Sequence, residues 1–130
     1  MDDCEYLLLS DFLAIAEANT DLDRTDLADN DEVIARALTG LWAPTSPAYE
    51  GIVLKAAVLE FSLIRARPLP RENVIVAHEC MKEFALRNGF DFDRRRDEID
   101  VDELFRAIIA GAPDALTRLA LWLAKTLVPR

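Results

Sequence analysis

The chain has little histidine, glycine or cysteine, and few basic residues for its many acidic ones. Its 130 residues include one histidine, four glycines and two cysteines, and 15 Lys and Arg stand against 24 Asp and Glu. The formal net charge is −9. Binding to DNA or RNA regardless of sequence requires a basic surface that displaces counterions from phosphates. The charge therefore argues against a nucleic-acid partner.

The two cysteines, Cys4 and Cys80, form neither a disulfide framework nor a metal-binding spacing. We therefore expect reduced thiols in a cytoplasmic protein, and no metal site. The first residues, Met1 to Asp3, lack the basic and apolar segments of a signal peptide. No apolar run approaches the roughly 20 residues that cross a bilayer, because Lys55 and Glu60 interrupt the longest one. We expect no membrane partner.

The chain does have abundant apolar residues arranged with helical spacing. Hydrophobic residues make up 52% of the sequence, which suffices for a core, and charged residues make up 30%, which suffices for a polar surface. A length of 130 residues is typical of one domain, and no internal repeat or linker marks a second. We predict a single domain over residues 1–130.

Start and stop signals divide the chain into helices. Ser10, the Asp29/Glu32 and Asp100/Glu103 capping boxes and Ser46-Pro47 are start signals, and Asn88-Gly89 is a stop signal. The predicted helices span residues 10–19, 29–41, 47–66, 71–88 and 100–111, and a last helix runs from 113 to before Pro129.

The third predicted helix is apolar nearly all round from Ile52 to Ile64, which indicates a central helix buried on several sides. Residues Phe90 to Asp93 alternate in polarity but form only a short extended stub. The predicted fold is an all-α bundle of about six helices with antiparallel neighbours.

Four segments carry a family resemblance through their order and spacing. They are Tyr6 to Ile15, Asp31 to Leu38, Tyr49 to Leu59 and Phe84 to Phe90. Through them the chain up to about Phe92 resembles the Doc (death-on-curing) branch of the Fic toxin family. The resemblance implies a Fic/Doc-like helical domain of toxin–antitoxin type.

The signature of that family, H-P-F-x-[DE]-G-N-x-R, falls on residues 67–75. In the family its histidine is a general base, its acid holds magnesium, and its glycine and asparagine shape a phosphate-binding turn at a helix N-terminus. Aligned without a gap, only Pro68 and Asn73 match. The mismatched positions hold Arg67, Leu69, Arg71, Glu72 and Ile75.

We expect these mismatches to abolish or severely reduce the chemistry of the signature. Arg67 stays protonated near pH 7 and cannot act as a base, and Arg71 places a cation where a magnesium ligand belongs. We assign no catalytic residue and expect no cofactor. Arg67, Arg71 and Asn73 remain a candidate anion- or nucleotide-binding site, with Arg65 nearby. The alternative is a solvated basic loop.

Two further features are candidate sites. His78 lies on the same helix as Asn73, roughly 7.5 Å further along the axis, and we expect a structural histidine. The segment from Asp21 to Glu32 has EF-hand-like spacing, but the required glycine is Asp26, so we expect a solvated loop and a helix cap.

The two tryptophans, Trp42 and Trp122, are expected to pack in the core. An exposed Trp42 would instead indicate a surface for a partner.

Our leading hypothesis is a degenerate Doc-like protein that acts through protein binding. In the family, a disordered tail of the antitoxin folds into a groove beside the active site. The resemblance therefore implies an antitoxin-like partner segment in a groove bordered by the central helix and residues 67–73.

Two alternatives stay open. One is an active, divergent transferase that moves phosphate or AMP from ATP, with magnesium, to a hydroxyl of a translation-factor-like protein. The other is a non-catalytic structural or oligomerising helical module, and a homo-oligomer is compatible with any of these hypotheses.

Overall fold

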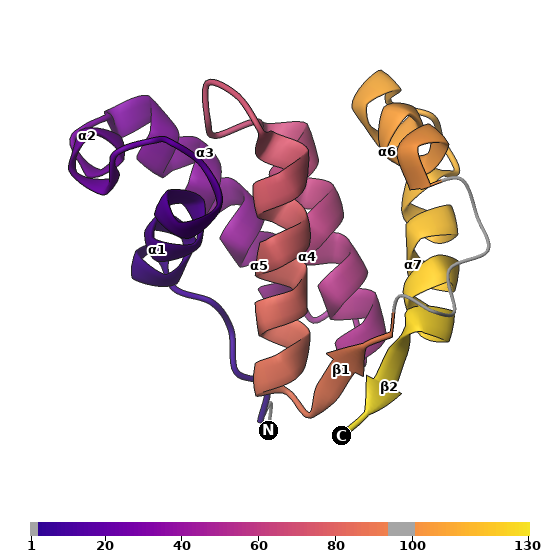
Figure 1. Cartoon of the computed structure of the whole chain (residues 1–130). Coiled ribbons are helices and arrows are strands. Elements are labelled where there is room, and N and C mark those ends of the chain that lie inside the picture. Colours follow the sequence, from indigo (N-terminus) through magenta and orange to yellow (C-terminus); the bar gives the residue numbers. More distant parts are fainter. Residues whose placement is uncertain (1–2, 94–100) are drawn as a thin grey trace.

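The computed structural model describes residues 3–93 and 101–130 (Figure 1). These residues form seven α-helices, a short 3-10 helix and two short strands, which confirms the predicted all-α bundle. In chain order the elements are α1 (Leu9–Asn19), α2 (Arg24–Ala28), α3 (Asp31–Trp42), η1 (Ala43–Thr45), α4 (Ile52–Ala66), α5 (Asn73–Arg87), β1 (Phe90–Phe92), α6 (Val101–Ala110), α7 (Ala115–Thr126) and β2 (Leu127–Pro129).

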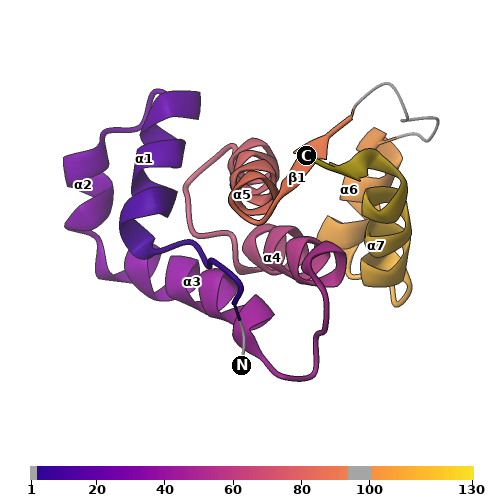
Figure 2. The same ribbon diagram turned by 90° about the horizontal axis from the view of Figure 1, so that it is seen from below.

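Helix α4 is the centre of the fold, as its apolar sequence predicts. It contacts α3, α5, α6, α7 and η1, and Figure 2 shows it between α3 and α7 with α5 alongside. Every residue from Lys55 to Glu60 is buried, and Leu63 and Ile64 are buried as well. Such a run covers every side of a helix, so α4 has no face reserved for solvent along this stretch.

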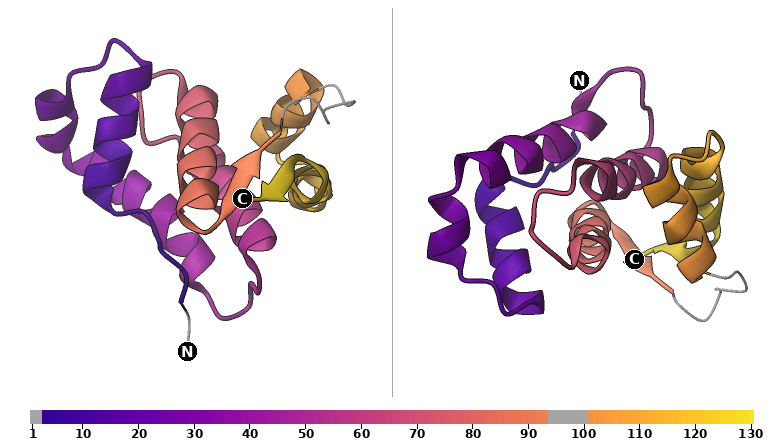
Figure 3. Two further views of the ribbon diagram at one scale, coloured as in Figure 1. Left: turned by 60° about the horizontal axis from the view of Figure 1, so that its bottom comes forward. Right: turned by 90° about the horizontal axis from the view of Figure 1, so that it is seen from above.

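Two groups of helices cover the α4–α5 pair from opposite sides. Figure 3 shows α1, α2 and α3 on one side and the α6–α7 pair on the other. None of the helices formed by residues 3–93 and 101–130 is long and apolar enough to cross a bilayer.

Helix α1 and helix α3 begin with caps other than the predicted ones. At α1 the Leu8 N–H donates to the Asp11 carboxylate at 2.8 Å, and Ser10 lies inside the helix. At α3 the cap is Asn30, whose side-chain oxygen accepts from two backbone N–H groups of the first turn. Asp29 was the wrong choice because its backbone is already helical at the end of α2.

Helix α4 begins at Ile52, five residues later than the Ser46-Pro47 signal predicts. Ser46 forms a turn instead, because its carbonyl accepts from the Tyr49 N–H at 3.1 Å and its hydroxyl accepts from the Ala48 N–H at 3.3 Å. Gly51 then has φ of 85°, a conformation that an L-residue rarely adopts and that precedes the first turn of α4. The signal marked a turn and not a helix.

The short extended stub is confirmed, and a second strand pairs with it. β1 and β2 are antiparallel, with Asp91 opposite Val128 and Phe92 opposite Leu127. The last helix therefore ends at Thr126, two residues before the predicted limit, because Leu127 to Pro129 are extended. The predicted cap Asp100 lies outside the described residues.

The Asp11–Arg87 ion pair joins α1 to the end of α5. Both guanidinium Nη atoms donate to the carboxylate, at 3.1 and 2.9 Å. The Arg87 hydrogen bond lowers the pKa of Asp11 from its ordinary value, although partial burial opposes this effect. The carboxylate form is thus the one that stabilises the fold.

We predict that Asp11→Asn lowers the free energy of unfolding by about 1 kcal/mol at pH 7. The pair stabilises the protein above the ordinary Asp pKa of about 3.9, and its contribution is lost as the pH falls through the lowered pKa. Urea unfolding at several pH values should show the difference from wild type shrinking toward pH 2. The exposed Glu50 gives a control, Glu50→Gln, with no such difference.

Candidate functional site

Residues 67–72 form the loop between α4 and α5 that carries the signature positions. Asn73 closes this loop with two hydrogen bonds, since its side-chain oxygen accepts from the Leu69 N–H and its side-chain nitrogen donates to the Leu69 carbonyl, both at 2.9 Å. Pro68 and Leu69 are buried beneath it. The Asn73 amide is therefore engaged in holding the loop.

Arg67 and Glu72 both adopt the left-handed region, with φ of 49° and 62°. Arg67 ends α4, because its N–H donates to the Leu63 carbonyl at 3.1 Å, and its own carbonyl accepts from Arg36 Nη1 at 3.4 Å. Left-handed conformations are costly for side chains other than glycine, so the surrounding contacts must impose them. Hydrogen bonds within the protein therefore hold the two ends of the loop in this conformation.

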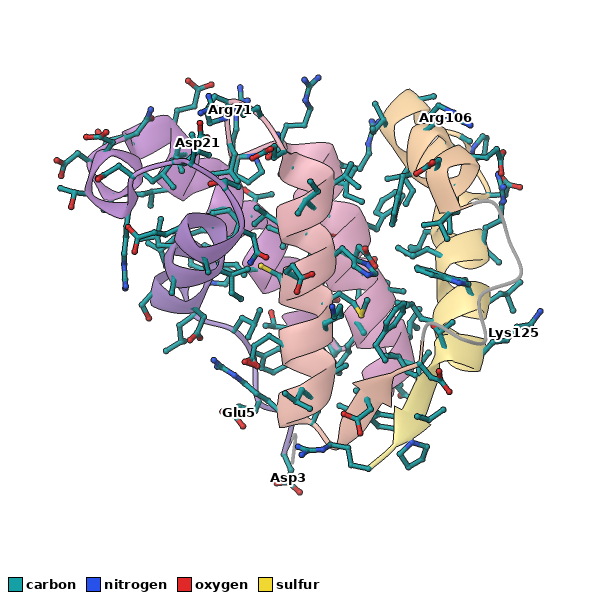
Figure 4. The ribbon with its side chains drawn as sticks, viewed as in Figure 1. Asp3, Glu5, Asp21, Arg71, Arg106 and Lys125 are labelled. Carbon is teal, nitrogen blue, oxygen red and sulfur yellow. The ribbon has the colours of Figure 1, made fainter. Side chains whose placement is uncertain are left out.

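Of the three arginines at or near the predicted anion site, Arg71 and Arg65 have separate partners. Arg71 Nη2 bonds Asp21 Oδ1 at 2.5 Å, and Figure 4 shows these two side chains facing each other at the top of the molecule. This hydrogen bond lowers the pKa of Asp21 and raises that of Arg71. Arg65 Nη1 donates to the carbonyl of Ile109 at 3.0 Å and so caps the end of α6. Arg67 and Arg71 both line the groove described in the next paragraph, whereas Arg65 is held at the end of α6.

A groove lies beside the loop on the α6 side, and we call it the loop groove. Its volume is about 340 Å³. Ile75 of α5 and Ile109 of α6 are each 50% exposed and line it. The other lining residues are Ile64, Arg67, Pro70, Arg71, Glu72, Asn73 and Val74.

A second hollow of about 360 Å³ lies on the other side of the loop, against α2 and α3. Arg67 and Pro70 line both spaces. Three acidic residues of the segment predicted to be a solvated loop and a helix cap line it: Asp23, Asp26 and Glu32. Asp23 caps α2, because its carboxylate accepts from the Thr25 and Asp26 N–H groups at 2.8 and 3.1 Å. The segment predicted as a solvated loop thus contains a short helix, α2, and the cap of α3 is Asn30 and not the predicted Asp29.

His78 is paired with a buried carboxylate, which the sequence did not indicate. Its Nδ1 lies 2.9 Å from Oε2 of Glu60 on α4, and the Glu60 side chain is fully buried. Rings from three elements surround the imidazole: Phe92 of β1, Phe105 of α6 and Trp122 of α7. His78 thus joins α4 and α5 to the C-terminal pair of helices, a structural position as expected.

The other carboxylate oxygen, Glu60 Oε1, has no hydrogen-bond partner. Within residues 3–93 and 101–130 it is the only fully buried side-chain oxygen or nitrogen that lacks one. Its charge also acts on Cys80, whose thiol pKa is raised first by burial and then by this carboxylate. Cys80 is therefore an unreactive core thiol. From the sequence, Glu60 appeared only as a charge that interrupts an apolar run.

The two tryptophans differ in exposure. Trp122 is buried, as predicted, whereas Trp42 at the end of α3 is 63% exposed. The prediction of core packing is wrong for Trp42, the last residue of α3 before the chain passes into η1.

Comparisons of the chain with protein-family models, with curated proteins and with solved structures gave no match. The likeness to the Doc branch therefore stands on the sequence segments alone. Among the described residues, no cluster of histidine, cysteine and acidic side chains has the grouping of a metal site.

We predict that His78→Ala destabilises the protein by about 3 to 5 kcal/mol, because it leaves the buried Glu60 carboxylate with no partner. Glu60→Gln keeps an acceptor for Nδ1 and should cost about 1 kcal/mol. The double variant Glu60→Leu/His78→Leu removes both polar groups and should be more stable than His78→Ala. Urea unfolding at pH 7 measures all three, and equal losses in the three variants would contradict this account.

Proposed function

We propose that this chain is a cytoplasmic, Doc-like domain of toxin–antitoxin type that acts by binding a protein. The loop groove is the binding surface, and its occupant is an amphipathic helical segment of the partner. The observation that carries the proposal is the pair of half-exposed isoleucines, Ile75 and Ile109, which face the same groove from two different helices.

When a partner covers half-exposed apolar side chains, apolar surface leaves water and the free energy of the complex falls. Ile64, Val74 and Pro70 extend the apolar surface between the two isoleucines. An amphipathic helix places residues at i, i+3, i+4 and i+7 on one side, which suits a groove of this kind. The Arg67 side chain also lines the groove, so an acidic residue on the partner helix is favoured there.

The transferase alternative has less support. The Asn73 amide is used to close the loop, and Arg71 is paired with Asp21. Glu72 occupies the first position before α5, where a phosphate would have to approach, and its charge would repel an anion. Binding a partner in the loop groove requires neither the Asn73 amide nor the Arg71 guanidinium.

We predict that Ile75→Asp/Ile109→Asp weakens partner binding at least tenfold, because carboxylates replace the two anchors of the groove. Wild-type and variant proteins should be used to capture partners from the native host, and the affinity for the purified partner should then be measured by calorimetry. Leu121→Asp is the control, since Leu121 is 61% exposed on α7 and does not line the groove. Undiminished binding by the double variant would overturn the proposal.

Titration with ATP, with and without magnesium, separates the proposal from the transferase alternative. The signals of His78 and the tryptophan side chains report binding in proton NMR. We expect no magnesium-dependent change up to millimolar ATP. Magnesium-dependent binding together with labelling of a protein hydroxyl would establish the transferase alternative instead.

A further inference from the structure

The β1 strand has one paired edge and one open edge. Two hydrogen bonds bracket the β1–β2 pair: Asp93 N–H donates to the Thr126 carbonyl at 2.7 Å, and Arg130 N–H donates to the Gly89 carbonyl at 2.9 Å. Backbone groups of alternate residues face alternate edges of a strand. Since residues 89 and 93 face β2, the N–H and C=O groups of Phe90 and Phe92 face away from it.

No third strand covers that edge in the part of the chain that the structure describes. An open strand edge presents unpaired N–H and C=O groups in the spacing that another strand requires.

A groove of about 390 Å³ runs beside β1, and we call it the strand-edge groove. All three residues of β1 line it. Its remaining lining comes from one face of α5, with Glu79, Lys82, Glu83 and Leu86 at helical spacing, and from Ile15 and Asn19 of α1. The groove therefore has a helical floor and a strand along one wall.

We propose that the strand-edge groove binds an extended peptide segment of a partner protein, which pairs with β1 as an added strand. Main-chain hydrogen bonds to Phe90 and Phe92 hold the segment, and its alternate side chains lie on the floor formed by α5 and α1. This surface is distinct from the loop groove, because Ile75 and Leu86 lie near opposite ends of the 15-residue helix α5, roughly 16 Å apart along its axis.

The lining residues define the chemistry of the segment. Leu86 is 39% exposed and Ile15 is half-buried, so side chains that face the floor are apolar. The groove holds three carboxylates, those of Glu79, Glu83 and Asp91, against the single cation of Lys82.

Ion pairs offset these carboxylates only loosely. Lys82 lies 3.3 Å from Glu79. Glu83 lies 3.7 Å from Arg87, and Asp91 lies 3.9 Å from Arg130; neither arginine lines the groove. With the net charge of −9, the field at the groove is negative and favours basic side chains on the segment. The expected ligand is an extended segment in which apolar and basic residues alternate.

The test uses the whole chain and a short capped peptide in which valine and lysine alternate. The peptide is titrated into 15N-labelled protein, and amide shifts and amide hydrogen exchange are recorded by NMR. We expect the amides of Phe90 and Phe92 to shift and to exchange at least tenfold more slowly when the peptide is bound. Leu86→Lys should weaken the peptide at least tenfold, because it removes apolar floor and adds a like charge.

Leu121→Lys is the matched control, since it makes the same substitution at an exposed leucine outside both grooves, and it should leave peptide affinity unchanged. A peptide that alternates valine and glutamate should bind at least tenfold more weakly. No shift at millimolar peptide, equal effects of the two leucine substitutions, or equal binding of the acidic peptide would overturn the proposal. Concentration-dependent dimerisation that protects the same amides without peptide would assign the edge to a second copy and would also overturn it.

Discussion

Helix α4 is covered on all sides from Lys55 to Glu60, so the buried polar side chains there need partners inside the protein, and the exposed Arg65 near its end has one as well. Lys55 donates from Nζ to the Pro44 carbonyl at 2.9 Å, Glu60 accepts from His78, and Arg65 caps α6. These three contacts lead to three different elements, η1, α5 and α6. The polar residues of the central helix thus fix the positions of the elements packed around it, which apolar contacts alone do less specifically.

The approach of α3 to α4 depends on a missing side chain. A Cβ atom at Gly40 would lie 2.5 Å from Leu63 Cδ2 and 3.2 Å from Leu63 Cα, so only glycine permits the two helices to pack this closely. Leu63 also accepts the N–H of Arg67, the residue that ends α4 and begins the loop. The close contact between α3 and α4 therefore lies one turn before the end of α4, where the loop begins.

Features that depend on neighbours in sequence were predictable, and those that depend on distant contacts were not. The central helix and the end of α5 at Asn88-Gly89 follow from local composition and capping, and both are found. β2 was missed because the extension of Leu127 depends on pairing with Phe92, 35 positions earlier. The Glu60–His78 pair was missed because it joins two helices across 18 positions. Glu60 alone, a charge within an apolar stretch, was a signal that a buried partner was needed.

The candidate site illustrates why a matching residue does not establish a matching chemistry. Asn73 is one of two residues that match the Doc signature, yet its amide makes both of its hydrogen bonds to the Leu69 backbone. Closing a loop whose ends are left-handed is a role that suits asparagine with or without a bound phosphate. The matching asparagine is therefore accounted for by folding. Beside the loop, Ile75 and Ile109 are half exposed and are not used in the core, and such apolar surface is suited to binding a partner and not to transferring a phosphate.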